Sequence, residues 1–274
     1  MEETFSNSGK CPLMVLRGKT MLLTVRNLVK EFGGLQAISN LSFEVNEGEI
    51  LGIIGPNGAG KSTLFNLLTG VLSPTHGEII FDERLVTGLP THVLAQRGIA
   101  RTFQTTRIFM DQTVLNNIMI GVVPKTKHSV WNAIMNRRKM KREEDGLLKR
   151  CQGVIRFIEL EEKTNRFAGE LGQEEQKRLA IGIAMATEPK LLLLDEPTGG
   201  INIEEINHLM GIIRKIWSKG ITICLIEHKM KMVMELCERI IVLNYGTKIA
   251  EGAPQEVRHN EAAIKAYLGE EYAA

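Results

Sequence analysis

A glycine-rich segment constrains this chain more than any other part of its sequence. It reads Gly55-Pro56-Asn57-Gly58-Ala59-Gly60-Lys61-Ser62 and fits the pattern GxxxxGK[ST]. A nearly continuous apolar run, Glu49 to Ile54, precedes it, and an amphipathic stretch, Ser62 to Leu68, follows it. In the order strand, glycine-rich loop and helix, such a loop curls its backbone N–H groups around a phosphate. We therefore expect a phosphate-binding loop here rather than an ordinary glycine-rich turn.

The polar residues of this loop suit the chemistry of a bound nucleotide. Lys61 would neutralise β- and γ-phosphate oxygens. The hydroxyl of Ser62 would bind Mg²⁺, a hard cation that takes oxygen ligands and keeps much of its water. We predict that ATP and Mg²⁺ bind through the loop and the next residue of the helix. The predicted cofactor-binding residues are Gly55, Pro56, Asn57, Gly58, Ala59, Gly60, Lys61, Ser62 and Thr63.

A second apolar run ends in two acidic residues. Leu191 to Leu194 is typical of a buried strand, and Asp195 and Glu196 follow at its carboxyl end, the end at which α/β sheets bind their ligands. Asp195 would hold Mg²⁺ through water, and Glu196 would polarise the water that attacks the γ-phosphate. An acidic pair after a strand is more often only a solvated strand end. Beside a phosphate-binding loop, the catalytic interpretation becomes the stronger one.

The rest of the pattern indicates an α/β fold. Alternating residues from Met21 to Leu28 and from Leu41 to Val45 predict a small antiparallel sheet. The buried run Ile221 to Ile226 and the amphipathic stretch from Ile206 to Ile216 extend a βαβ pattern with a parallel sheet. From Thr113 to Leu160, apolar residues recur at helical spacing, which predicts an inserted helical subdomain.

Composition and charge argue against several other classes of protein. The 274 residues include 34 Lys and Arg against 32 Asp and Glu, so the net charge of +2 creates no field that favours nucleic acid. The basic residues between Arg137 and Arg142 are followed at once by acids, and no aromatic residues interleave with them. No run reaches the roughly 18 apolar residues of a membrane helix. The four cysteines form no CxxC pair, which argues against a zinc site.

With these motifs the chain resembles the ATP-binding subunits of ABC transporters, from about Met21 to Gly269. The resemblance implies a P-loop NTPase core of the RecA-like kind, with an antiparallel β subdomain and an α-helical subdomain inserted at about residues 105–168. It also implies a flexible tail over residues 1–20, the ATPase domain over 21–254, and a C-terminal helix and tail over 255–274.

The resemblance assigns roles to further residues. Gln104 matches the glutamine that touches Mg²⁺ and the attacking water, and His228 matches the switch histidine at the γ-phosphate. Phe32 is similar in position to the aromatic that stacks on adenine, although an aromatic before two glycines could equally pack a turn. Asn202 resembles part of the loop that crosses to a second ATPase. The predicted catalytic residues are Glu196, His228 and Gln104, and the predicted metal residues are Ser62, Gln104 and Asp195.

Three segments, Gly98–Gln104, Ile226–His228 and Ala266–Glu270, are similar to the ATPases of branched-chain amino acid importers. Relatives that move urea, other amino acids or lipopolysaccharide share much of the sequence of these segments. A non-transport soluble ABC-type ATPase is the alternative, but such proteins usually carry two cassettes or a long coiled coil. The resemblance implies a Mg-dependent ATPase on the cytoplasmic side of the cell membrane. Its partners would be transmembrane permease subunits, which we expect to dock around residues 104–121, and not nucleic acid.

One segment departs from the family pattern. The family reads Leu-Ser-Gly-Gly-Gln at the start of a helix that grips the γ-phosphate bound by the facing subunit. Counting back from Asp195 places Leu171–Glu175 there, so Gly172 replaces the serine and Glu174 replaces a glycine. A bare carboxylate about 4 Å from a phosphate charge would repel it by roughly 4 kcal/mol at an effective dielectric near 20, although these acids could simply stabilise the helix end. The departure favours a head-to-tail heterodimer with an ATPase chain whose signature is intact.

Overall fold

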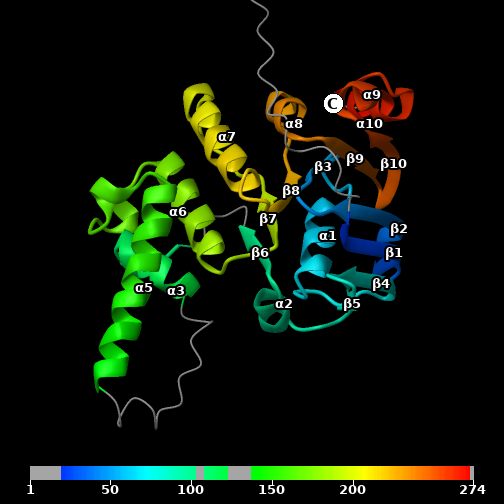
Figure 1. Cartoon of the computed structure of the whole chain (residues 1–274). Coiled ribbons are helices and arrows are strands. Elements are labelled where there is room, and N and C mark those ends of the chain that lie inside the picture. Colours follow the sequence, from blue (N-terminus) through cyan, green and yellow to red (C-terminus); the bar gives the residue numbers. More distant parts are fainter. Residues whose placement is uncertain (1–19, 103–107, 123–136, 272–274) are drawn as a thin grey trace, which may run out of the picture.

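The computed structural model describes residues 20–102, 108–122 and 137–271, and its strands form two sheets (Figure 1). The first sheet is antiparallel with the order β2-β1-β4-β5. Its strands are β1 (Met21–Phe32), β2 (Leu35–Asn46), β4 (His76–Phe81) and β5 (Arg84–Leu85). The predicted antiparallel sheet is confirmed, and its first two strands are longer than the alternating pattern indicated.

The second sheet carries the buried apolar runs of the sequence. Its order is β10-β9-β3-β8-β7-β6, in which only the pairing of β10 with β9 is antiparallel. Its strands are β3 (Ile50–Ile54), β6 (Ile99–Thr102), β7 (Leu191–Asp195), β8 (Thr222–Ile226), β9 (Arg239–Asn244) and β10 (Thr247–Gly252). The parallel pairing expected from the βαβ pattern is therefore confirmed.

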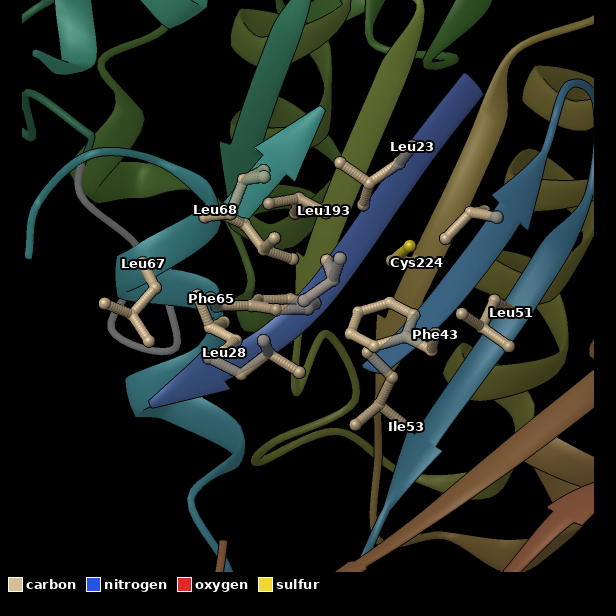
Figure 2. Close-up of a cluster of buried hydrophobic side chains, with 14 of the residues drawn as sticks. Leu23, Leu28, Phe43, Leu51, Ile53, Phe65, Leu67, Leu68, Leu193 and Cys224 are labelled. Carbon is tan, nitrogen blue, oxygen red and sulfur yellow. The ribbon is translucent and has the colours of Figure 1, made fainter. Parts of the chain in front are cut away.

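Both faces of the parallel sheet are buried, which explains why its strands are continuously apolar. In β7, Leu191 and Leu193 pack in one core with α1 (Lys61–Leu68) and the antiparallel sheet. Figure 2 shows Phe65 and Leu68 of α1 in this core, with Leu193 among the labelled side chains. On the opposite face, Leu192 and Leu194 pack in a second core with α7 (Ile203–Trp217) and α8 (Met230–Leu236).

The described residues between β6 and β7 form the predicted helical layer, which lies to one side of the sheets in Figure 1. Its helices are α3 (Val114–Val122), α5 (Arg137–Phe157) and α6 (Gln173–Ala186), with 3₁₀ turns at η2 (Glu161–Lys163) and η3 (Ala168–Glu170). These elements share a core of their own, in which Ile118, Ile155 and Leu179 are buried. The layer therefore holds α6 in place through apolar packing.

The remaining helices lie at the edges of the two sheets. They are α2 (Thr91–Arg97), α9 (Pro254–Arg258) and α10 (Glu261–Glu271). The C-terminal segment expected over 255–274 thus contains two helices as far as residue 271. The tail expected over 1–20 lies outside the described residues up to residue 19. In the described part of the chain, no helix combines the length and apolarity that a membrane crossing needs.

Gly121 lies at a close contact between α3 and α6 and allows a direct test of this packing. A methyl group added at Gly121 would lie 2.4 Å from the carbonyl oxygen of Ile183 and 2.8 Å from Cβ of Ala186. We predict that Gly121→Ala lowers the free energy of unfolding by about 1–3 kcal/mol, because the two backbones must separate. Gly211→Ala in α7 is the control, since its methyl group would meet nothing within 4 Å.

The control should be neutral or stabilise the chain by up to about 1 kcal/mol through higher helix propensity. Urea unfolding measures both variants. Equal stability of the two alanine variants would contradict the packing described for α3.

Candidate functional site

Three loops meet at the carboxyl edge of the parallel strands. β3 leads into the loop 55–60, β7 ends at Asp195, and β8 ends at Ile226, two residues before His228. The register pairs Ile226 with both Ile53 and Asp195. Because parallel strands place their carboxyl ends at one edge, the phosphate-binding loop, the acidic pair and His228 lie side by side. This edge is the candidate site.

The path of the loop depends on glycine at both of its ends. Gly55 has φ +154°, and a methyl group there would lie 2.2 Å from the carbonyl oxygen of Leu243. Gly60 has φ +99°, and a methyl group there would lie 2.6 Å from the carbonyl oxygen of Ala37. Any other residue would force the loop outward. The helix α1 begins directly after Gly60 and carries no acidic residue in its first turn, so its N-terminus offers N–H groups to an anion.

The predicted loop residues come together around the side chain of Lys61. Its Nζ donates hydrogen bonds to the carbonyl oxygens of Gly55 at 2.6 Å and Pro56 at 2.8 Å. Lys61 is buried, whereas Ser62 is exposed and Thr63 half-buried in the first turn of α1. The loop therefore holds an ammonium group beside its N–H groups, with a hydroxyl next to it. This is the donor set that a triphosphate requires.

Asp195 is buried beside a cation that sequence reasoning missed. Arg101 on β6 donates from Nη2 to Oδ2 of Asp195 at 2.7 Å and from Nη1 to Oδ1 of Asn66 at 2.7 Å. Its guanidinium carbon lies 5.5 Å from the centre of the Phe65 ring. Arg101 thus connects β6, β7 and α1. The available signal was a charged residue within the short apolar strand Ile99–Thr102, because a buried charge needs a partner.

The other oxygen of Asp195 fits a metal-bound water. Within the described residues, Oδ1 of Asp195 is buried and has no hydrogen-bond partner. The same part of the chain contains no group of three or more His, Cys, Asp and Glu side chains suited to a metal ion. Mg²⁺ in phosphate sites needs only one or two protein ligands, so Ser62 and Asp195 are sufficient donors. Gln104, predicted as a catalytic and metal residue, lies outside the described residues.

Glu196 and His228, two predicted catalytic residues, are in direct contact. Nε2 of His228 lies 2.9 Å from Oε1 of Glu196. The backbone N–H of Glu196 donates to the carbonyl oxygen of Ile226 at 2.9 Å. Glu196 has φ +46°, an uncommon conformation for a residue other than glycine that is often retained at functional sites. The structure thus confirms the pairing of the strand ends on which these predictions depended.

Glu227 is a second site residue that sequence reasoning missed. Its buried Oε1 accepts hydrogen bonds from the backbone N–H of Thr198 at 2.9 Å and from its hydroxyl at 2.5 Å. Oε2 accepts from the N–H groups of His228 at 3.0 Å and Lys229 at 3.2 Å. A buried carboxylate requires such donors, and here they come from both loops. Glu227 therefore fixes the loop after β7 relative to the loop after β8.

The loop that follows Glu196 is anchored at both ends. Nζ of Lys229 donates to the carbonyl oxygens of Thr198 at 3.1 Å and Ile201 at 3.2 Å. Asn202, expected to lie in the loop that crosses to a second ATPase, caps α7 by accepting from the N–H of Glu205 at 3.0 Å. The Glu205 carboxylate accepts in return from the N–H of Asn202 at 2.8 Å. These contacts tie the loop to Lys229 and to the start of α7.

Helix α6 also contributes positive charge to this edge. Burial lowers the pKa of Lys177, and the negative charges of Glu227 and Glu196 act in the opposite direction.

Phe32 ends β1 with 45% of its surface exposed, and Nζ of Lys30 lies 4.9 Å from the centre of its ring. Its role in stacking on adenine stays a prediction.

The structure corrects the expectation for the signature segment. The helix α6 begins at Gln173 after Gly172, but the carboxylate of Glu174 is not bare. Nε of Arg178 lies 2.8 Å from Oε1 of Glu174 and donates to Oε2 at 2.9 Å, and both side chains are 7% exposed. Glu175 accepts from the N–H of Gly172 at 3.0 Å and forms an ion pair with Lys163. The expected repulsion from an unpaired acid was therefore wrong, because neighbouring cations neutralise both carboxylates.

Comparisons with known proteins support this reading of the site. The family profile described as "ABC transporter" matches residues 38–199, and the profile described as "Branched-chain amino acid ATP-binding cassette transporter" matches residues 247–273. The chain is 42% identical to the high-affinity branched-chain amino acid transport ATP-binding protein LivG of Salmonella typhimurium, over 91% of this chain and 98% of that protein.

Two solved structures are similar as well. A nucleotide-free ATP-binding cassette from an ABC transporter has a TM-score of 0.80 and 32% identity, over 90% of this chain and 99% of that one. A dimeric ATP-binding cassette in a post-hydrolysis state, bound to ADP and Pi, has a TM-score of 0.72 and 26% identity, over 85% of this chain and 99% of that one.

The buried pair between Arg101 and Asp195 yields a stability prediction. Arg101→Met leaves the Asp195 carboxylate buried beside an apolar side chain, so we expect the free energy of unfolding to fall by about 3–5 kcal/mol. Adding Asp195→Asn removes the charge and should restore most of this loss. The control is Lys190→Met, which breaks the exposed pair with Asp82 and should change stability by less than about 1 kcal/mol. Urea unfolding at neutral pH would contradict the prediction if both single variants lost equal stability.

Proposed function

The chain belongs to the ABC transporter family of ATP-binding proteins, and we propose that it hydrolyses ATP to drive branched-chain amino acid import through separate membrane subunits. The observation that carries the proposal is the shared edge at which the phosphate-binding loop, Asp195 and the Glu196–His228 pair meet. The C-terminal profile match and the name of the LivG relative support the substrate class. A non-transport ATPase would account for the site but not for these two similarities.

Each site residue has a defined task in the proposed hydrolysis. The N–H groups of the loop and Lys61 stabilise negative charge on the β- and γ-phosphates. Glu196 accepts a hydrogen bond from the attacking water, and His228 holds that carboxylate in place. A Mg²⁺ ion bound by Ser62 and, through water, by Asp195 would neutralise further charge. Glu227 is a positioning residue, because its carboxylate contacts the loops and not the reactants.

Two further assignments belong to the same proposal. Phe32 stacks on the adenine ring, which its exposed position at the end of β1 permits. Gln104, which lies outside the described residues, would contact Mg²⁺ and the attacking water, as the resemblance implies.

We predict that Glu196→Gln separates binding from turnover. The variant should bind ATP as tightly as the unmodified chain, because the loop and Asp195 are unchanged. Its turnover should fall by about 10²-fold or more, since the amide cannot accept a proton from water. Glu204→Gln, in the exposed first turn of α7, is the control and should hydrolyse ATP normally. Undiminished hydrolysis by the Glu196→Gln chain would remove Glu196 from this role.

Hydrolysis by the unmodified chain should also require Mg²⁺ and stop when EDTA is added.

The proposed contact with the membrane subunits involves two exposed apolar residues. Phe109 is 54% exposed and Met110 46%. Val114 and Leu115, which also lie within the expected range 104–121, instead pack in the core of the helical layer. Exposed large apolar side chains next to each other are typical of interaction surfaces. We therefore place the docking surface at Phe109 and Met110, on the loop before α3.

We expect the double variant Phe109→Asp, Met110→Asp to lose its membrane subunits. Charged side chains would have to be desolvated at the interface, which weakens binding strongly. Gentle membrane solubilisation followed by mass spectrometry of the co-purifying proteins measures the loss. Leu85→Asp, at a position that is 60% exposed on β5 of the antiparallel sheet, is the matched control. Full recovery of the subunits with the double variant would place the docking surface elsewhere.

We propose that a different ATPase chain pairs head to tail with this one. Dimeric cassettes that hold ADP and Pi support pairing. The glycine at position 172, where the family has the signature serine, favours a heterodimer, whereas the charge of Glu174 does not because Arg178 pairs with it. The assembly would sit on the cytoplasmic side of the membrane. Intact-mass analysis of the purified complex tests this arrangement, and two copies of this chain without another cassette would contradict it.

A further inference from the structure

A cavity of about 420 Å³ lies between the helical layer and the amino ends of two parallel strands. Pro189 and Ile221, which stand just before β7 and β8, form its wall on the side of the sheet. The candidate functional site lies at the carboxyl ends of the same strands, so the cavity is at the opposite edge of the sheet. Ligand cavities in proteins have volumes of roughly 300–1,000 Å³ and often lie where two structural units meet. This cavity therefore has the size and position of a small-molecule site.

Apolar side chains from several elements form most of the cavity wall. They are Val122, Val154, Phe157, Met185, Pro189 and Ile221. Helix α5 lines the cavity with positions 150, 153, 154 and 157, whose spacing is that of one helix face. Gly153 leaves part of this face open, since a methyl group there would meet nothing within 4 Å. Glycine inside a helix lowers stability, and at this position it keeps the cavity accessible.

Three charged residues line the described part of the cavity, and two of them form an ion pair. Nη2 of Arg150 pairs with Oε1 of Glu188, and the two side chains are 41% and 61% exposed. The third is Lys219, whose Nζ lies 4.2 Å from the centre of the Phe157 ring. The cavity thus combines an apolar wall with a cation and an anion that are in direct contact with each other.

Glu188 is an unfavourable residue for its position in the chain. It follows the end of α6 with φ +51°, a conformation in which glycine or asparagine is usual after a helix. Its negative charge also lies at the negative end of the helix dipole, and the last turn of α6 has no basic residue. The exposed ion pair with Arg150 contributes little to stability. Residues that break local rules in this way are often retained for function.

We propose that this cavity binds a free amino acid with an aliphatic side chain, such as leucine. The carboxylate of the ligand binds Arg150 with Lys219 as a second cation, its ammonium group binds Glu188, and its alkyl side chain lies against the apolar wall. Because one carbon atom carries both charged groups of an amino acid, they require a cation next to an anion, as Arg150 and Glu188 are. A guanidinium has five N–H donors and a carboxylate has two oxygens, so the pair can bind both groups without separating.

Binding of leucine to the purified full chain tests the proposal, with saturation-transfer NMR of the leucine methyl signals as the measurement. We expect a dissociation constant on the order of 1 mM, which is within the range for a ligand of this size. Alanine keeps both charges but lacks most of the apolar surface, so it should bind at least about tenfold more weakly. The 2-oxo acid with the leucine side chain lacks the ammonium group and should also bind about tenfold more weakly. Absence of saturable leucine binding would overturn the proposal.

Two glycines of α5 provide a matched pair of variants that locates the bound leucine. Gly153→Leu should abolish binding because its side chain fills the cavity. Gly146→Leu is the control, since Gly146 also meets nothing within 4 Å but does not line the cavity. Both changes raise helix propensity, so both chains should fold. Equal leucine binding by the two variants would place the ligand elsewhere and overturn the proposal.

The charge of Glu188 has a test of its own. Glu188→Gln should bind leucine about tenfold more weakly and should no longer prefer leucine to its 2-oxo acid, because the anion that attracts the ammonium group is gone. An unchanged preference would contradict the assigned role of Glu188.

The site itself does not depend on ATP hydrolysis; the proposed function contributes only the choice of leucine as the probe. A chain that binds leucine as described but hydrolyses no ATP in its complex would refute the proposed function and leave the site standing. An active complex whose chain does not bind leucine would overturn the site alone.

Discussion

Parallel pairing of β3, β8 and β7 is the constraint on which the rest of the site depends. The three strands end at one edge, where the phosphate-binding loop and the start of α1, Asp195 with Glu196, and His228 come together. A shift of one residue would move a strand by about 3.3 Å and turn its side chains to the opposite face. The 2.9 Å contact between Glu196 and His228 would then be lost. Continuous apolar packing on both faces of the sheet fixes this register.

Two buried carboxylates, together with their partners, also fix the elements of the site relative to one another. Asp195 and Glu227 are carboxylates of very low exposure, and burial of an unpaired carboxylate is strongly unfavourable. Arg101 compensates the first, and N–H and hydroxyl donors from both loops compensate the second. Since these partners come from separate elements, each compensation also fixes one element relative to another. The site is thereby held in position before a nucleotide binds, as electrostatic catalysis requires.

The sequence predicted those parts of the fold and site that depend on neighbouring residues. The loop Gly55–Ser62, the buried strands and the acidic pair each have a local pattern, and the structure places them as expected. The pair between Arg101 and Asp195 joins residues 94 positions apart, so no spacing rule could indicate it.

The i,i+4 spacing of Glu174 and Arg178 was visible, but its burial was not. The burial depends on the turn after α5, whose carbonyl oxygens accept from Arg178. For that reason a carboxylate expected to repel a phosphate proved to be part of an internal ion-pair network. Gln104 lies outside the described residues, and its role rests on the resemblance alone.

Uptake of labelled leucine into proteoliposomes tests the central claim most directly. The chain and its membrane subunits are reconstituted so that solute is supplied outside and the cassettes face ATP enclosed in the lumen. The account predicts that leucine accumulates against its gradient only when Mg²⁺ and hydrolysable ATP are enclosed. Steady ATP hydrolysis without movement of leucine, isoleucine or valine would contradict it and would favour an ATPase that does not transport these amino acids.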